Sequence, residues 1–342
     1  MPRACLSLFA LFAVTAALLN AQASYAPPKE GLPNPYRAIP NWAKLPDGRR
    51  WGATAGVAVA PNGNIWAIDR CGMQHGCGDS KLDPIIEFDQ SGRPLRKFGG
   101  GLIVGPHGLF VDRDSNVWVT DEAVSEDHKR GAQVTKFSPD GKVLMRLGKA
   151  GVTGEGPDVF GSATDVVVAA NGDIFVADGH DECTCPNRRI MKFSKDGKFI
   201  KAWGKRGTGP GEFGGLHGMA LDSQGRLFIA DRTNSRVHVY TQDGKFIASW
   251  EQFGRPSALA IDKDDNLYVS ESQGPLVPNA KTRGIRIGSV TDGKVRAFVP
   301  DPRSTVQGLA VDRQGNLYGA ENGNLHSEVE EGTRDVKKYV KE

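Results

Sequence analysis

The sequence predicts an all-β fold, a six-bladed β-propeller whose blades each hold four antiparallel strands. A strand–turn–strand phrase that ends in an acidic residue occurs six times along the chain. A second turn, usually containing Asp-Gly or Ser-Gly, follows five of these phrases. The composition agrees, because 43 glycines and 20 prolines among 342 residues favour many short strands over long helices.

The repeated phrase describes two strands joined by a tight turn. An apolar run leads into a turn of Asp, Asn or Gly, and an alternating run such as 116–120 follows. We expect the closing acids to accept backbone hydrogen bonds; they are Asp69, Asp121, Asp178, Asp231, Glu271 and Glu321. The inner strands are expected near residues 57–60, 109–112, 166–169, 219–222, 259–262 and 309–312.

The second turn adds two more strands to a unit. Its glycine supplies the positive φ that a hairpin connection requires. Its copies lie at residues 89–93, 138–142, 194–198, 241–245 and 290–294. Four-stranded units repeated at this period form a propeller, in which radial repetition leaves few exposed sheet edges. We therefore expect residues 55–342 to form one propeller.

The last unit is predicted to be completed by the N-terminal part of the chain. It lacks the second turn and ends after a third strand around residues 335–340. The segment 38–45, just before the first phrase, can supply the missing strand and close the ring. We therefore expect residues 24–54 to be a lead-in that includes this closing strand.

Residues 1–23 have the features of a signal peptide. Arg3 precedes an apolar run from Leu6 to Leu19, and Ala21-Gln22-Ala23 fits a cleavage site. We expect export to the periplasm or the medium, without a membrane anchor. The net charge of +3 includes no long run of one sign and gives no reason to expect nucleic acid as a partner. A monomer is favoured.

Export would leave four cysteines, Cys71, Cys77, Cys183 and Cys185. An even number of cysteines in an oxidising compartment favours disulfides. The simplest pairing joins Cys71 to Cys77 and Cys183 to Cys185, and pairing across the two loops is the alternative. A metal site that combines the first two cysteines with His75 is a further alternative.

The residue fourteen positions before each closing acid is expected at one end of the central channel. These residues are Ala55, His107, Thr164, His217, Ser257 and Gln307. His107, His217 and Gln307 belong to alternate units, so their side chains can converge on the axis and hold a metal with an open coordination position. The residue after each acid lies on the same face, which places Arg70 and Arg232 where they can bind a carboxylate.

The repeated phrase resembles an NHL repeat, and the chain most resembles the peptidyl-α-hydroxyglycine α-amidating lyase family. The resemblance covers about residues 50–320. Its most specific motifs are Pro106-His107-Gly108-Leu109, Leu216-His217-Gly218-Met219 and Ala230-Asp231-Arg232. In that family three such histidines hold zinc, and the enzyme converts a C-terminal α-hydroxyglycine into a peptide amide and glyoxylate.

The resemblance implies roles for particular residues of this chain. His107 and His217 match zinc ligands, and Arg70 and Arg232 match arginines of the active site. The backbone carbonyls of Val57 and Leu109 match positions that bind calcium in the family.

Three positions differ from the family pattern. Gln307 replaces the third histidine, and a neutral amide is a poorer zinc ligand than imidazole. Gly308 stands where the family has an aspartate at its calcium site, which weakens the expectation of calcium. His180 replaces a tyrosine and is expected at the same mouth of the channel, as a base or as a residue that completes the metal shell.

These observations lead to two main functional hypotheses. The first is an exported metal-dependent enzyme, similar to the lyases, that acts on a small or peptide substrate bearing a carboxylate. The second is a non-catalytic propeller that binds a protein or peptide on its loop face, since a fold alone does not define a function. A hydrolytic, lactonase-like enzyme would need acidic metal ligands, and the two histidines argue against it. The metal content of the purified protein distinguishes the first two hypotheses.

Overall fold

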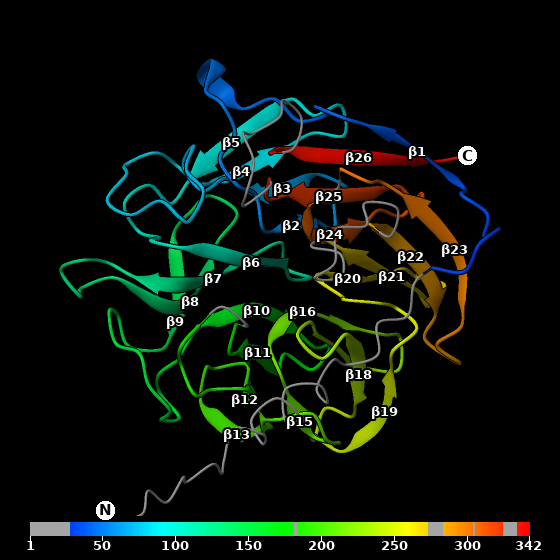
Figure 1. The fold of residues 1–342 in the computed structure, drawn as a ribbon. Helices are drawn as coiled ribbons and strands as arrows, with labels where there is room; N and C mark the ends of the chain where they lie inside the picture. The colour runs from blue at the N-terminus through cyan, green and yellow to red at the C-terminus, as the bar shows by residue number, and fades with distance from the viewer. Residues whose placement is uncertain (1–27, 181–182, 273–282, 304, 324–333) are drawn as a thin grey trace, which may run out of the picture.

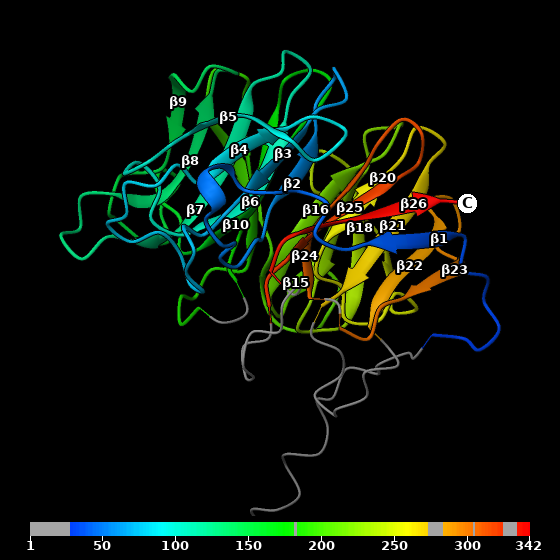
Figure 2. The same ribbon diagram turned by 90° about the horizontal axis from the view of Figure 1, so that it is seen from above.

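The computed structural model describes residues 28–180, 183–272, 283–303, 305–323 and 334–342. Within these residues the strands form six four-stranded antiparallel sheets and one two-stranded parallel pair. Figure 1 shows the six sheets arranged around a common centre, and Figure 2 shows the same ring from above. The predicted six-bladed propeller is confirmed, whereas the predicted signal peptide lies outside the described residues.

The first three blades follow the predicted order of strands. Blade one holds β2 (Val57–Val59), β3 (Ile65–Ile68), β4 (Ile85–Phe88) and β5 (Pro94–Phe98). Blade two holds β6 (Pro106–Val111), β7 (Val117–Val124), β8 (Gly131–Phe137) and β9 (Val143–Leu147). Blade three holds β10 (Ala163–Val168), β11 (Ile174–Asp178), β12 (Arg189–Phe193) and β13 (Phe199–Trp203).

The last three blades continue the ring. Blade four holds β16 (Leu216–Leu221), β17 (Leu227–Asp231), β18 (Arg236–Tyr240) and β19 (Phe246–Trp250). Blade five holds β20 (Leu259–Ile261), β21 (Asn266–Glu271), β22 (Gly284–Ser289) and β23 (Val295–Pro300). Blade six holds β24 (Val306–Val311), β25 (Leu317–Glu321), β26 (Val336–Lys341) and β1 (Tyr36–Ile39). The remaining described elements are the pair β14 (Lys205–Arg206) and β15 (Glu212–Phe213) and the 3-10 helix η1 (Pro46–Gly48).

The ring is closed by β1, which pairs antiparallel with β26 as the fourth strand of blade six. The strand lies at residues 36–39 and so begins before the predicted segment 38–45. It ends where Pro40 offers no N–H and Asn41 adopts a positive φ of 53°. The residues that follow pack on another blade, because Ala43 and Leu45 join the apolar cluster of Ile65 and Phe88.

The hydrophobic core lies between neighbouring blades. One cluster, for example, joins Ile68 and Ile85 of blade one to Leu109, Val119 and Phe137 of blade two. The alternating strands supply these side chains from one face of each sheet. Within the described residues, no helix has the length and apolar character needed to cross a membrane.

The closing acids fix the segment that leads into the inner strand of their own blade. Asp121 accepts the N–H groups of Val104 and Gly105 at 2.9 and 2.7 Å. Equivalent bonds to backbone N–H groups are made by Asp69, Asp178, Asp231 and Glu321. These five acids therefore hold the start of an inner strand in place, and this is where the predicted site residues lie.

Candidate metal centre

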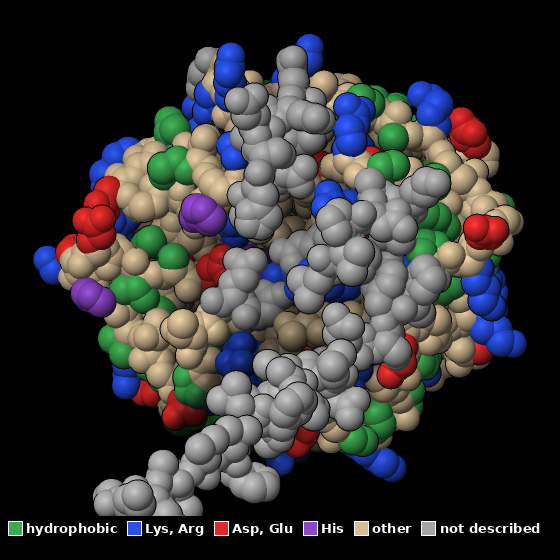
Figure 3. Space-filling model, in the orientation of Figure 1, with side chains coloured by type: hydrophobic (Ala, Val, Ile, Leu, Met, Phe, Trp, Pro, Cys, Tyr) green, Lys and Arg blue, Asp and Glu red, His purple; other side chains and the backbone are tan. Residues whose placement is uncertain are grey.

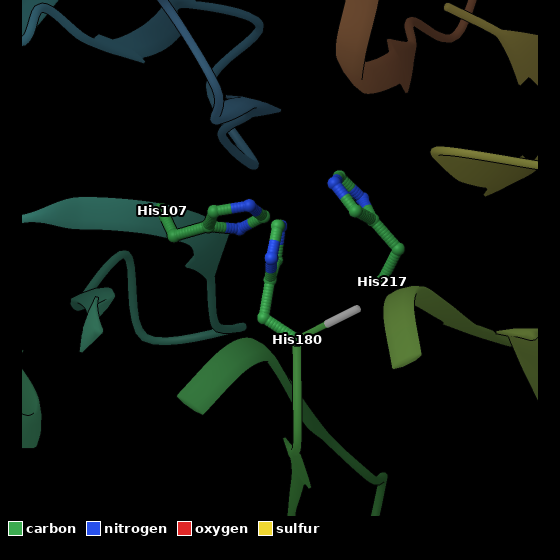
Figure 4. A group of neighbouring side chains, drawn as sticks. All are labelled: His107, His180 and His217. Carbon is green, nitrogen blue, oxygen red and sulfur yellow. The ribbon is translucent and has the colours of Figure 1, made fainter. Parts of the chain in front are cut away.

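Three buried histidines from three different segments meet at one end of the channel. His107 belongs to β6, His217 belongs to β16, and His180 follows β11 by two residues. Figure 4 shows the three imidazole rings directed toward a shared space. One ligand nitrogen from each ring lies within 4.8 Å of the others. The ring centroids are 4.7 to 5.4 Å apart.

Two of these rings are oriented by backbone carbonyl groups. His107 Nδ1 lies 2.8 Å from the carbonyl oxygen of Thr164, and His217 Nδ1 lies 2.8 Å from that of Ser257. A carbonyl oxygen can only accept, so Nδ1 carries the proton and Nε2 presents its lone pair. Both Nε2 atoms are buried without a hydrogen-bond partner among the described residues. Two lone pairs that converge in this way fit a metal ion.

A glycine after each histidine makes these carbonyl contacts possible. A Cβ atom on Gly108 would lie 2.7 Å from the Thr164 oxygen, and one on Gly218 would lie 2.9 Å from the Ser257 oxygen. Any larger residue would therefore push the neighbouring inner strand away from the ring nitrogen. The His-Gly pairs seen in the sequence thus let adjacent blades approach closely.

The imidazoles of His107 and His217 are electrically neutral at neutral pH. Burial is the main cause that lowers the pKa of His107, to about 3; Glu122 opposes this shift, and His180 and Arg70 add to it. Burial also lowers the pKa of His217 well below its usual range, and Arg232 adds to this effect. Neutral imidazole is the form that binds metal ions.

Gln307, predicted as the third ligand, is buried in β24 and lines a channel cavity of about 440 Å³ together with His107 and His217. His180, predicted as a base or as a residue completing the shell, joins the other two histidines. The group therefore contains three imidazoles. A ligand role for Gln307 stays a prediction.

Arg70 lies at the same mouth and is held by three protein oxygens. Its Nε donates to the carbonyl of Pro106 at 3.1 Å, and Nη1 donates to the carbonyl of Gln74 at 3.2 Å. Its Nη2 pairs with Glu122 Oε1 at 3.0 Å. The other predicted arginine, Arg232, is buried and places Nη2 at 3.4 Å from His180 Nε2.

Glu122 is a site residue for which the sequence analysis predicts no role. Burial raises the pKa of its carboxyl, but interactions with His107, His180 and the two arginines outweigh burial and lower the pKa to about 2. The carboxylate therefore stays ionised inside the mouth. A signal for it existed in the sequence, because Glu122 follows its closing acid as Arg70 and Arg232 follow theirs.

The positions after the closing acids are equivalent in the structure as well. At five of the six positions the N–H group donates to the carbonyl of the residue seventeen positions earlier. The bond is made by Arg70, Glu122, Gly179, Arg232 and Asn322. These side chains therefore start from corresponding points around the mouth. Figure 3 shows one face of the ring, with basic and acidic side chains close to its centre.

Val57 and Leu109, the residues predicted to bind calcium, both line the channel cavity. Gly308 also lines it, and a Cβ atom there would lie 2.4 Å from the carbonyl oxygen of Ala55. The backbone at residue 308 therefore leaves no room for a carboxylate side chain, and calcium at Val57 and Leu109 stays a prediction.

Both predicted disulfides are formed within their own loops in the structure. Cys71 is bonded to Cys77, and Cys183 is bonded to Cys185. The pairing across the two loops and the metal site with His75 are not adopted. Each bond lies close to a residue of the mouth, because Cys71 follows Arg70 directly and Cys183 lies three residues after His180.

The fold and the site together define a six-bladed propeller with a histidine-lined mouth. A family model described as a 6-bladed beta-propeller matches residues 162–251. The chain is 34% identical over 291 residues to a protein of Caenorhabditis elegans named "Probable peptidyl-alpha-hydroxyglycine alpha-amidating lyase pgal-1", with 78% of this chain and 79% of that protein covered. The chain belongs to the peptidyl-α-hydroxyglycine α-amidating lyase family.

The matches to other relatives span a smaller share of those proteins. Identity to peptidyl-glycine alpha-amidating monooxygenase B of Xenopus laevis is 36% over 206 residues, which is 54% of this chain and 22% of that protein. The chain thus spans about a fifth of the length of that relative. Identity to human NHL repeat-containing protein 3 is 32% over 207 residues, or 59% of this chain and 55% of that protein.

Among solved structures, a gluconolactonase from Xanthomonas campestris shares the fold. Its TM-score is 0.56 at 16% identity, with 92% of this chain and 97% of that chain covered. At this identity the likeness concerns the fold alone.

Proposed function

We propose that this protein is a metal-dependent lyase that cleaves a carbinolamide, the class represented by a peptide ending in α-hydroxyglycine. The observation that carries the proposal is the pair of buried Nε2 lone pairs on His107 and His217, with His180 beside them. Family membership supports the same chemistry. The two disulfides support export to an oxidising compartment.

In this proposal His107, His180 and His217 hold the metal, with zinc favoured because three imidazoles suit it. A bound zinc ion would supply Lewis acidity and lower the pKa of a coordinated hydroxyl group. His180 is assigned to the metal rather than to the role of base. Gln307, on the inner strand of blade six, lines the same channel cavity.

The other residues of the mouth bind and orient the substrate. Arg70 and Arg232 supply positive charge toward a substrate carboxylate, and burial strengthens such charge interactions. In the reaction the substrate hydroxyl loses its proton, the bond between the carbinol carbon and the amide nitrogen breaks, and that nitrogen gains a proton. The products are an amide and glyoxylate, so atoms and electrons balance without an oxidant.

The proposal is tested by metal analysis and by glyoxylate release from a peptidyl-α-hydroxyglycine. We expect about one zinc per chain in the wild type and loss of the metal in His107→Ala and His217→Ala. The exposed His128 provides a control, and His128→Ala should retain the metal. Metal binding without glyoxylate release would indicate another substrate. If the protein binds no metal and releases no glyoxylate, the non-catalytic binding module is favoured.

A further inference from the structure

Arg334 is an arginine at the rim of the mouth that the proposed function does not use. It lies two residues before β26 in blade six, and its Nη2 donates to the side-chain oxygen of Gln74 in blade one. Gln74 Nε2 in turn donates to the carbonyl of Asn322 at 3.2 Å, and the Gln74 carbonyl accepts from Arg70 at 3.2 Å. Because Asn322 and Arg70 both occupy mouth positions, Arg334 lies at the rim where blades six and one meet.

The charge of Arg334 has no acidic partner among the described residues. Its hydrogen bond there goes to a neutral amide oxygen, and its Nε is buried without an acceptor. Burial lowers the pKa of Arg334, and no described carboxylate opposes this shift. Lys337, three residues later, differs because both Asp301 and Glu321 form ion pairs with it. A partly desolvated cation that lacks a counter-charge is stabilised by an anionic ligand.

The side chain of Arg334 is positioned by the backbone beneath it. A Cβ atom on Gly323 would lie 2.8 Å from both Cγ and Nε of Arg334, so the glycine lets the side chain pack closely. The side chain is partly exposed, so a ligand can reach it from solvent. The neutral amide of Gln74 is a weaker acceptor than a carboxylate. Arg334 is therefore held in place and can still bind an anion.

The rim at Arg334 lies across the ring from the metal ligands. The three histidines belong to blades two, three and four, whereas Arg334 belongs to blade six. Figure 1 shows β24 to β26 on the other side of the centre from β10 and β16. Arg70 extends toward blade two, where its Nη2 pairs with Glu122. A substrate with its carbinol carbon at the metal and its carboxylate toward Arg70 can therefore extend its acyl half toward Arg334.

We propose that Arg334 binds a carboxylate in the acyl half of the substrate, the half that leaves as the amide. The preferred substrates then carry an acidic group in this half as well as the carboxylate next to the carbinol carbon. This inference rests on the proposed function, because it concerns the other half of the same substrate. It narrows the substrate class to carbinolamides of acidic peptides or of dicarboxylic acids.

The test compares two unreactive ligands, N-succinylglycine and N-acetylglycine, by calorimetry on the zinc-loaded protein. The first has a second carboxylate in its acyl half, and the second has none there. We expect the wild type to bind N-succinylglycine about tenfold more tightly, because a hydrogen bond between charged groups is gained. Arg334→Gln should bind the two ligands with similar affinity. Arg334→Lys keeps the charge and should retain part of the preference.

Arg313→Gln is the matched control, because Arg313 is an exposed arginine in the turn between β24 and β25, at the other end of blade six. This variant should keep the wild-type preference, and circular dichroism shows whether each variant is folded. The inference is overturned if the wild type binds the two ligands equally or does not bind N-succinylglycine, or if the preference persists in Arg334→Gln. Glyoxylate release from N-acetyl-α-hydroxyglycine, whose acyl half is neutral, tests the proposed function separately.

Discussion

At the scale of single residues, the orientation of His107 and His217 depends on one backbone carbonyl each. The contact at 2.8 Å fixes the tautomer and turns Nε2 toward the other histidine. The ring of His180 lies beside Arg232, whose Nη2 is 3.4 Å from His180 Nε2. The site therefore combines two rings held by the propeller scaffold with one ring held by a connection between strands.

His180 should contribute more to metal affinity than Gln307 does. Imidazole is a better zinc ligand than an amide, so we expect His180→Ala to weaken zinc binding by at least about tenfold. Gln307→Ala should change the affinity by no more than about threefold. Competition with a chromogenic chelator measures both constants, with His128→Ala as the control. A larger loss of zinc affinity in Gln307→Ala would indicate that the Gln307 amide is also a metal ligand.

At the scale of elements, the inner strands bring the site together because they approach one another closely. Gly108 is the point of closest approach between β6 and β10, where a Cβ atom would lie 2.7 Å from the Cα of Asp165 and from the Thr164 oxygen. These are backbone atoms and cannot rotate away. The spacing of the two strands therefore controls the contact that orients His107.

Gly108→Ala should separate β6 from β10 and weaken the metal site. We expect a loss of unfolding free energy of about 1–3 kcal/mol from the overpacked backbone. Zinc affinity should fall as well, since the carbonyl of Thr164 moves away from His107. Thermal unfolding and zinc titration measure the two effects. In the control Gly156→Ala the new methyl group would meet only side-chain atoms, at 3.1 Å or more, and neither quantity should change much.

At the scale of the whole molecule, blade six joins the two ends of the described chain. β1 pairs with β26, and the N–H of Asn41 donates to Asp335 Oδ2 at 2.7 Å. Lys337, in β26, forms ion pairs with Asp301 and Glu321 at 2.6 and 3.0 Å. The closure of the ring thus includes a buried cluster of charged groups.

This cluster makes the stability of the ring depend on pH. Burial raises the pKa of Glu321 to about 7; Lys337 lowers it less, and Asp301 raises it further. Between about pH 4.5 and 7 the folded state keeps a proton that the unfolded state releases, so this contribution to stability falls as the pH rises. We expect Glu321→Gln to remove a pH dependence on the order of 3 kcal/mol.

Thermal unfolding of the wild type and Glu321→Gln at several pH values between 4.5 and 8 tests this expectation. The exposed Glu126 offers a control, and Glu126→Gln should follow the wild-type curve. Curves for Glu321→Gln that run parallel to the wild type across this range would contradict the assignment.

The features that sequence could predict are those that repeat with the blades. The strands, the turns and the placing of His107 and His217 follow from one offset that recurs six times. The participation of His180 does not follow from this offset, because the position of His180 depends on the path of the connection between β11 and β12. The role of Glu122 was missed for a different reason: its position was regular, but its partner depends on the direction of a side chain. The bounds of β1 depended on Pro40 and Asn41, which no repeat encodes.

The ring of equivalent mouth positions has a consequence for how such proteins diversify. The backbone bond at each position is the same whether the residue is arginine, glutamate, glycine or asparagine. The fold therefore places little constraint on the side chain at these positions, except at Gly179, where φ is +133° and a Cβ atom would lie 2.0 Å from the Asn187 carbonyl oxygen. A descendant of this protein could acquire a new substrate through one codon change at such a position, while the strands and the core stay as they are.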